Sequence, residues 1–199
     1  GAIGEVRAAQ GTIAFFTDDP NDIRNNPDLG GGALYDTGSY VLSACSIVLG
    51  RAPERVICAM DIDPSFGVDR QTTVLLDYGS AHASFTASIR AGPTVPGTHQ
   101  QLSVLGSKGW LRFDFPYAHA RPLRCHIQIG DTTSIGSFPV RELTFEPVSQ
   151  YASQAERFSR LVRGEPARSW PIEGALGTIR TIEALFRSAK TGTWERLPS

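Results

Sequence analysis

The feature that most constrains the fold is a run of seven short strand-like segments between Arg55 and Glu146. Each is rich in β-branched or aromatic residues, and clusters of Gly, Pro or Asp separate it from the next. Short links between consecutive strands favour antiparallel pairing. The segments are RVICAMDI, QTTVLLDYG, HASFTASIR, HQQLSVLG, GWLRFDF, LRCHIQIG and FPVRELTFEP. The sequence therefore predicts an open, mostly antiparallel β-sheet.

Helical patterns flank this run on both sides. In 33–50 the apolar residues recur at three- and four-residue spacing, and Gly50 follows as a C-terminal cap. Segments 153–164 and 172–192 each place apolar residues on one helical face, and 5–16 reads as a further strand. The order predicts one α+β domain over residues 1–199, with helices packed on one face of the sheet.

Composition excludes several classes of partner. The net charge is −1 and the basic residues are spread along the chain, so neither nucleic acid nor a membrane is an expected partner. The basic residues are 17 Arg and two Lys, a bias typical of GC-rich bacterial genomes.

Three distant cysteines without a CxxC pair, and the absence of a run of about 18 apolar residues, indicate a cytoplasmic protein. The four histidines lack metal-ligand spacing, so no metal site is predicted.

The tetrapeptide Asp-Thr-Gly-Ser at 36–39 is the one found in aspartic proteases. Such a protease needs two aspartates that share a proton, and this chain has only one such segment. Asp36 and Tyr40, four residues apart, are instead expected on one face of a helix near its N-terminal end. There they can share a substrate hydroxyl, or they can serve the helix dipole and packing.

The segment NDIRNNPDLGGGALYDTGSYVLSACSIVLGRAPERV resembles the core of the C-terminal domain of Gfo/Idh/MocA oxidoreductases. Its form R-x-x-P-x-x-GGGAL-x-D-x-G-x-Y resembles the branch of glucose-fructose oxidoreductase, dimeric dihydrodiol dehydrogenase and NADP-linked xylose dehydrogenase. The likeness includes GEVRAAQ near the start, LSVLGSKGWLRFDFPY in the middle and PIEGALGTIRTIEALFRSAKTGTWERL at the end. It implies an oxidoreductase that acts on a sugar or diol hydroxyl.

The resemblance also implies an N-terminal Rossmann domain that binds NAD or NADP at a G-x-G-x-x-G loop and supplies a catalytic lysine in a Glu-Lys-Pro sequence. Neither motif occurs in this chain. We therefore expect residues 1–199 to be a substrate-binding and dimerisation domain, inactive alone, that lacks the cofactor domain and forms a homo-oligomer through its sheet. The alternative is a non-catalytic, stand-alone assembly or sensor module of the same fold.

The resemblance assigns roles to individual residues. Tyr40 matches the family's proton donor or acceptor, and Asp36 matches the carboxylate that orients the substrate hydroxyl and the general acid. A phenol with a pKa near 10 is a poor base alone, so the missing lysine is expected to assist it. Arg24 is expected to contact substrate hydroxyls or a cofactor phosphate, or to anchor its loop, and Asp22 and Asn25 are weaker candidates. Gly31 and Gly32 either let the backbone approach the nicotinamide or form a tight entry to the helix.

Overall fold

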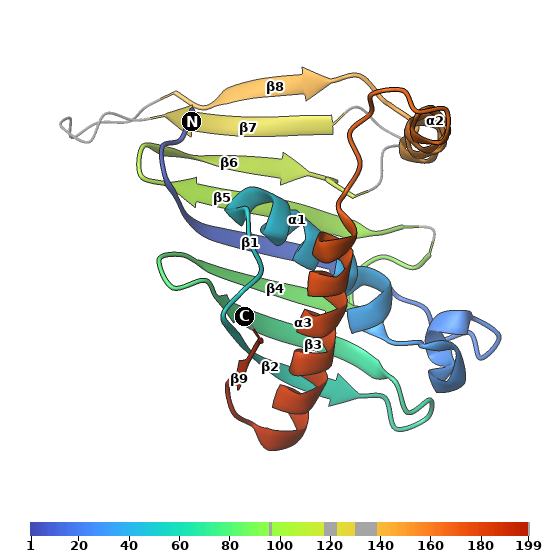
Figure 1. Cartoon of the computed structure of the whole chain (residues 1–199). Coiled ribbons are helices and arrows are strands. Elements are labelled where there is room, and N and C mark those ends of the chain that lie inside the picture. Colours follow the sequence, from blue (N-terminus) through green and yellow to red (C-terminus); the bar gives the residue numbers. More distant parts are fainter. Residues whose placement is uncertain (96, 118–122, 130–138, 199) are drawn as a thin grey trace.

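A single nine-stranded sheet dominates the structure, a computed structural model that describes residues 1–95, 97–117, 123–129 and 139–198 (Figure 1). The strands are β1 (Val6–Ala14), β2 (Arg55–Ile62), β3 (Asp69–Asp77), β4 (His82–Ser88), β5 (His99–Gly106), β6 (Gly109–Asp114), β7 (Leu123–Ile129), β8 (Arg141–Phe145) and β9 (Glu195–Arg196), in the spatial order β8-β7-β6-β5-β1-β4-β3-β2-β9. Among the described strands β1 and β4 form the one parallel pair. The predicted open, mostly antiparallel sheet is confirmed. Gly130 and Phe138, at the ends of two predicted strands, lie outside the described residues.

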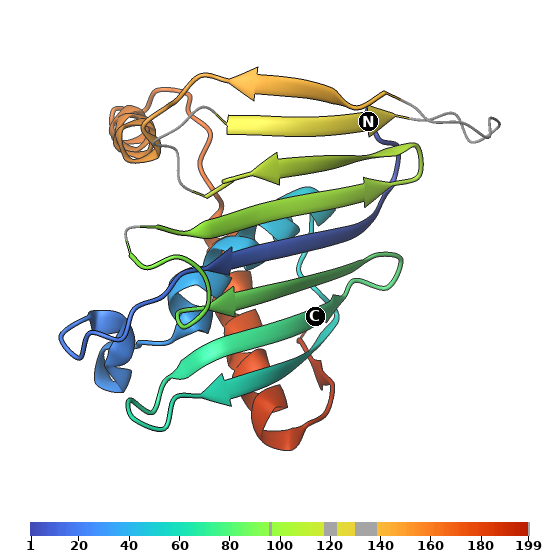
Figure 2. The same cartoon turned by 180° about the vertical axis from the view of Figure 1, so that it is seen from behind.

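Helices cover one face of this sheet and leave the other face bare (Figures 1 and 2). Helix α1 (Ser39–Leu49) and helix α3 (Ile172–Thr191) lie across the strands and bury Val41, Leu42, Cys45, Ile182 and Leu185 against them. Alternate residues of the central strands point into the same core, as the two-residue period of a strand requires. The predicted α+β architecture is therefore confirmed. Among the described helices, none combines the length and apolar character needed to span a bilayer.

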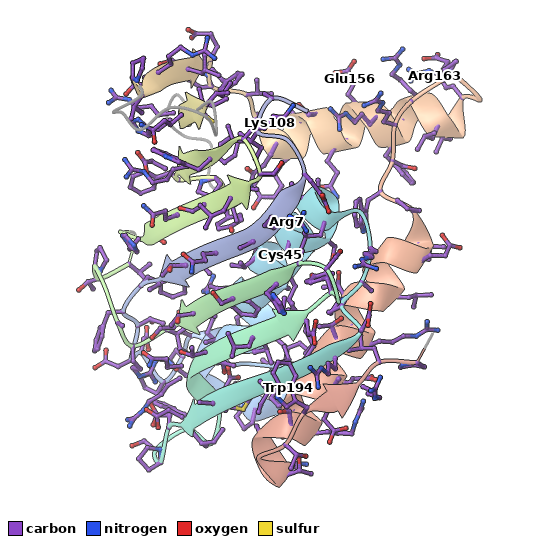
Figure 3. All side chains as sticks on the ribbon, turned by 90° about the vertical axis from the view of Figure 1, so that its left-hand side faces the viewer. Arg7, Cys45, Lys108, Glu156, Arg163 and Trp194 are labelled. Carbon is purple, nitrogen blue, oxygen red and sulfur yellow. The ribbon has the colours of Figure 1, made fainter. Side chains whose placement is uncertain are left out.

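Helix α2 (Gln150–Val162) behaves differently from the other two. It extends away from the sheet on the side of α1 and α3, as Figure 3 shows with Glu156 and Arg163 labelled, and none of its residues is buried. Its apolar residues Phe158, Leu161 and Val162 fall on one face, as the sequence predicts, yet all three are exposed. An amphipathic helix normally covers its apolar face, so this surface is available for a further contact.

Gly11 on β1 allows α1 to lie close to the sheet. A Cβ atom at this position would be 2.3 Å from the Val41 Cγ1 atom of α1 and 3.4 Å from the Tyr117 hydroxyl. Val41 is fully buried, so it has no open space into which it can move. The close approach of helix and strand therefore requires glycine at residue 11.

Gly11→Ala should lower the free energy of unfolding by about 1–3 kcal/mol, because the added methyl group overpacks a closed core. The control is Gly177→Ala within α3, where the nearest atom to the new methyl group is the Ala52 Cβ atom at 4.0 Å. That change should raise stability by about 0.5–1 kcal/mol, because alanine favours the helix. Urea unfolding followed by circular dichroism measures both, and equal effects of the two substitutions would contradict the packing described.

Candidate functional site

A pocket of about 650 Å³ opens at the edge of the sheet where β1 and β6 end and β5 begins. Three of the residues that the sequence singled out, Arg24, Asp36 and Tyr40, line it. Its wall is otherwise largely aromatic and apolar, with a few hydroxyl and amide groups. These further residues are Ile13, Phe15, Thr37, Val95, Gly97, Thr98, Gln100, Tyr117, Val148, Ser149, Gln150 and Tyr151.

The helix that carries Asp36 and Tyr40 does not begin as a regular α-helix. Residues Leu34–Gly38 form a π-helical turn, η3, in which the Ser39 N–H donates to the Leu34 carbonyl five residues back. The Thr37 hydroxyl donates to the Ala33 carbonyl at 2.8 Å, a side-chain bond that competes with the regular helical ladder. Single π-helical turns are frequent at functional sites. The sequence predicted the helix but not this turn, which directs both Asp36 and Tyr40 into the pocket.

Arg24 lies between two carboxylates. Its Nε–H donates to Asp36 Oδ2 at 2.8 Å, and its Nη1 donates to Asp22 Oδ1 at 3.1 Å. The side chains of Arg24 and Asp36 are 35% and 30% exposed, so solvent and a ligand can reach the pair. The guanidinium group also lies over the Phe15 ring, 5.5 Å from its centroid. Arg24 therefore both anchors its loop and faces the pocket.

The Arg24–Asp36 pair leaves one donor group and one acceptor atom for a ligand. Within the described part of the chain, Arg24 Nη2 and Asp36 Oδ1 have no hydrogen-bond partner. A hydroxyl group both donates and accepts hydrogen bonds. The two side chains can therefore bind one hydroxyl, or two neighbouring hydroxyls, of a bound molecule.

Tyr40 lies beside this pair with its hydroxyl in the protonated state. Burial raises the pKa of Tyr40 above its ordinary value, and the neighbouring Tyr151 and Asp36 raise it further, while Arg24 opposes them. Its ring lies 6.3 Å from that of Tyr117, tilted by 56°. At neutral pH the Tyr40 phenol can therefore donate a proton, and a neighbouring cation is needed before it can act as a base.

Arg90, two residues after the end of β4, holds the loop that carries Arg24. Its Nη2 donates to Asn25 Oδ1 at 2.8 Å, and the same nitrogen is 2.9 Å from Asp63 Oδ2. The ion pair is largely buried, because 14% of the Arg90 side chain and 7% of that of Asp63 are exposed. Breaking a buried pair leaves an uncompensated charge. Sequence reasoning missed both residues, because no local motif connects positions so far apart in the chain.

Asp69, at the start of β3, fixes the N-terminal end of the helical segment that carries Asp36 and Tyr40. Its Oδ2 atom accepts hydrogen bonds from the Leu34 N–H and the Thr72 hydroxyl, each at 2.8 Å. A side chain at Gly32 could not coexist with this contact, since its Cβ atom would be 2.0 Å from Asp69 Oδ1. The backbone at Gly32 also has a φ of +109°, which favours glycine. The triple glycine thus forms a tight entry to the helix.

Gly31 and Gly32 do not line the pocket. The Gly31 N–H donates to the Asn26 carbonyl at 3.0 Å, and the Gly32 N–H donates to the Arg24 carbonyl at 2.9 Å. Both backbone donors are therefore already used within the loop. Their contact with a cofactor stays a prediction. The two hydrogen bonds hold the shape of the loop.

The open sheet, the helices on one face and the pocket at its edge place the chain in a class of α+β domains. The family model of the GFO/IDH/MocA C-terminal domain matches residues 1–112. The chain belongs to this family, and the fold expected from the resemblance is confirmed.

Relatives of known sequence and structure agree with this assignment. The chain is 35% identical over 196 residues to an uncharacterized oxidoreductase, ORF334, of Rhizobium meliloti, covering 98% of this chain and 57% of that protein. It is 30% identical over 191 residues to D-xylose 1-dehydrogenase (NADP(+)) 2 of Haloferax volcanii, covering 96% and 56%. The chain thus spans little more than half the length of these relatives.

Solved structures show the same fold. The crystal structure of aldose-aldose oxidoreductase from Caulobacter crescentus complexed with glycerol matches with a TM-score of 0.80 at 28% identity, covering 99% of this chain and 57% of that one. Levoglucosan dehydrogenase in complex with NADH and levoglucosan matches with a TM-score of 0.82 at 16% identity, covering 100% and 60%. At that identity the second likeness concerns the fold alone.

Asp69→Asn should change how stability depends on pH. Burial raises the pKa of Asp69 to about 6 from an ordinary value of 3.8, although the Thr72 and Leu34 hydrogen bonds oppose the shift. Between these values the folded chain binds more protons than the unfolded chain, so this carboxyl contributes stability at low pH that is lost as pH rises. Relative to Asp69→Asn, the wild type should therefore lose about 2–3 kcal/mol between about pH 4 and pH 7. Urea unfolding of both proteins across this range measures the difference, and parallel pH profiles would contradict it.

Proposed function

We propose that this chain is the substrate-binding part of an NAD(P)-dependent oxidoreductase that acts on a hydroxyl group of a sugar or diol. The observation that carries the proposal is the meeting of Arg24, Asp36 and Tyr40 in one pocket of a GFO/IDH/MocA domain. Relatives named as a xylose dehydrogenase and an aldose-aldose oxidoreductase support the substrate class. The aromatic wall of the pocket suits the apolar faces of a sugar ring.

In the proposed reaction Tyr40 exchanges a proton with the reacting oxygen. Reduction of a carbonyl needs a proton on the oxygen as a hydride reaches the carbon, and Tyr40 is protonated and positioned to supply it. Arg24 Nη2 and Asp36 Oδ1 bind hydroxyl groups and orient the substrate beside the phenol. In the oxidative direction Tyr40 needs a neighbouring cation that lowers its pKa. A lysine of the cofactor domain is the proposed source.

A nicotinamide, when bound, accepts or supplies the hydride, and we propose that a Rossmann domain outside residues 1–199 holds it. The chain contains no G-x-G-x-x-G loop, and the Gly31 and Gly32 N–H groups are already bonded within their own loop. An exposed apolar surface on the helical side supports the docking of such a domain. Its residues belong to α1, α2, α3 and the segment before α3, and they are Ile47, Phe158, Val162, Trp170, Ile172 and Leu176.

The rival function is a non-catalytic assembly or sensor module of the same fold. Such a module needs no protonated phenol beside a solvent-accessible Arg–Asp pair, and the pocket geometry therefore favours the catalytic role.

We also propose a cytoplasmic location, which the three free cysteines support, two of them buried.

Tyr40→Phe in the complete oxidoreductase should lower kcat by about 10²–10⁴-fold, because the proton donor is lost while the ring is kept. The KM for the nicotinamide cofactor should change little. Steady-state kinetics with an aldose substrate measures both constants.

The matched control is Tyr35→Phe in the π-helical turn that precedes the helix of Tyr40. The Tyr35 ring centroid lies 5.3 Å from that of Phe186, and Tyr35 does not line the pocket. Turnover by Tyr35→Phe should therefore be unchanged. Unchanged turnover by Tyr40→Phe would remove the proposed role of the phenol.

We also propose that the bare face of the sheet forms a contact between two copies of the protein. Leu75, which is 51% exposed, lies on this face beside the hydrogen-bonded hydroxyl pair of Thr73 and Thr86. Figure 2 shows that no described helix covers this face. Two such faces can pack on each other around a two-fold axis.

Leu75→Arg should convert the dimer into a monomer, because each copy would then bring an unpaired charge into the proposed interface. Light scattering coupled to size-exclusion chromatography measures the mass. Leu29→Arg, an equal change at an exposed position of the loop before the helix, should leave the dimer intact. A monomeric wild type, or a dimeric Leu75→Arg variant, would contradict the proposed contact.

A further inference from the structure

We propose that Asp22 makes the pocket selective for uncharged polyols and against anionic sugars such as uronic acids and sugar phosphates. The inference rests on the proposed function, since it concerns the substrate that the Arg24–Asp36–Tyr40 pocket binds. It assigns to Asp22 a role in specificity, distinct from the roles of the three residues proposed to contact the substrate.

The charge of the described part of the pocket is the first observation. Arg24 and Asp36 are the charged side chains among its described lining residues. Asp22 is not itself a lining residue, but it places a second carboxylate on the guanidinium, with Oδ1 at 3.1 Å and Oδ2 at 3.4 Å from Arg24 Nη1. One cation therefore faces two anions, and the three groups together carry a net charge of −1.

The second observation is that Asp22 is held in place in its ionised form. Its Oδ1 atom accepts the Arg24 backbone N–H at 2.9 Å, and its Oδ2 atom accepts the Thr17 hydroxyl at 3.1 Å. Only 17% of its side chain is exposed. Burial alone would raise the pKa of Asp22, but these hydrogen bonds and the Arg24 charge hold the pKa below its ordinary value. The carboxylate cannot turn away to release Arg24 for another anion.

These contacts distinguish two kinds of ligand. A neutral hydroxyl uses Arg24 Nη2 and Asp36 Oδ1, which stay available while Arg24 is paired. A carboxylate or phosphate needs the unpaired charge of a guanidinium, usually through two parallel hydrogen bonds. Here Arg24 Nε–H and Nη1 are already bonded to carboxylates, so the guanidinium has no unpaired charge to offer an anion, and the Asp22 carboxylate adds a negative charge beside it.

The test compares D-glucose with D-glucuronate, which carries a carboxylate at C6, in the wild type and in Asp22→Asn. Asparagine is a favoured cap residue, and its amide oxygen can accept the Arg24 N–H as the carboxylate does. The wild type should bind and turn over glucose in preference to glucuronate. Asp22→Asn should shift the ratio of the two kcat/KM values toward glucuronate by about tenfold or more, with the shift reduced at high salt.

Two control variants separate charge from loop structure. Asp22→Glu keeps the charge and should keep the wild-type preference. Asp28→Asn removes an exposed charge from the same loop that is not paired with Arg24, and it should leave the ratio unchanged. A ratio that Asp22→Asn leaves unchanged, or a wild type that accepts both sugars equally, would overturn the proposal.

Equilibrium binding of the same two sugars by ligand-observed NMR keeps this proposal separate from the proposed reaction. Binding of glucose with weak binding of glucuronate, reversed toward glucuronate in Asp22→Asn, would support the charge selection even if no hydride transfer were detected. That result would reject the oxidoreductase function alone. Turnover without charge discrimination would reject the role of Asp22 alone, and absence of binding by either sugar would overturn both.

Discussion

The contact between the Asp69 carboxylate and the Leu34 N–H is the interaction on which the site depends. It connects the first residue of a central strand to the first turn of the helix that carries Asp36 and Tyr40. The bond requires glycine at residue 32, and it keeps a carboxyl group buried with its pKa raised to about 6. The chain thus holds a costly buried acid, and that acid fixes the start of the π-helical turn at the pocket edge.

The second constraint is the sharing of one guanidinium between two carboxylates. Arg24 is bonded to Asp36 and Asp22 at distances of 2.8 and 3.1 Å, so it cannot act as an unpaired anion receptor. The pair instead presents a donor beside an acceptor, next to a protonated phenol whose pKa is raised by burial. This arrangement matches the chemistry of a hydroxyl group, and it is the physical reason for proposing a neutral polyol as the substrate.

Two surfaces of the domain remain without a partner among the described residues. No described helix covers the face of the sheet opposite α1 and α3, and the apolar face of α2 is exposed. A soluble domain rarely leaves an amphipathic helix uncovered. The family relatives are longer than this chain by more than a third of their own length. We therefore regard these surfaces as the contacts proposed for a second copy and for a cofactor domain.

Local patterns in the sequence are enough to predict the strand-rich run after residue 55, the helices around it and the shared position of Asp36 and Tyr40. These features follow from local periodicity and from turn residues, which act over a few positions. The folded chain was needed to find the partners of Arg24, the buried pair of Arg90 with Asp63, the capping by Asp69 and the exposure of α2. Those contacts join residues that are far apart in the chain, or depend on how an element packs. Their energies arise from burial and charge pairing, which no local pattern encodes.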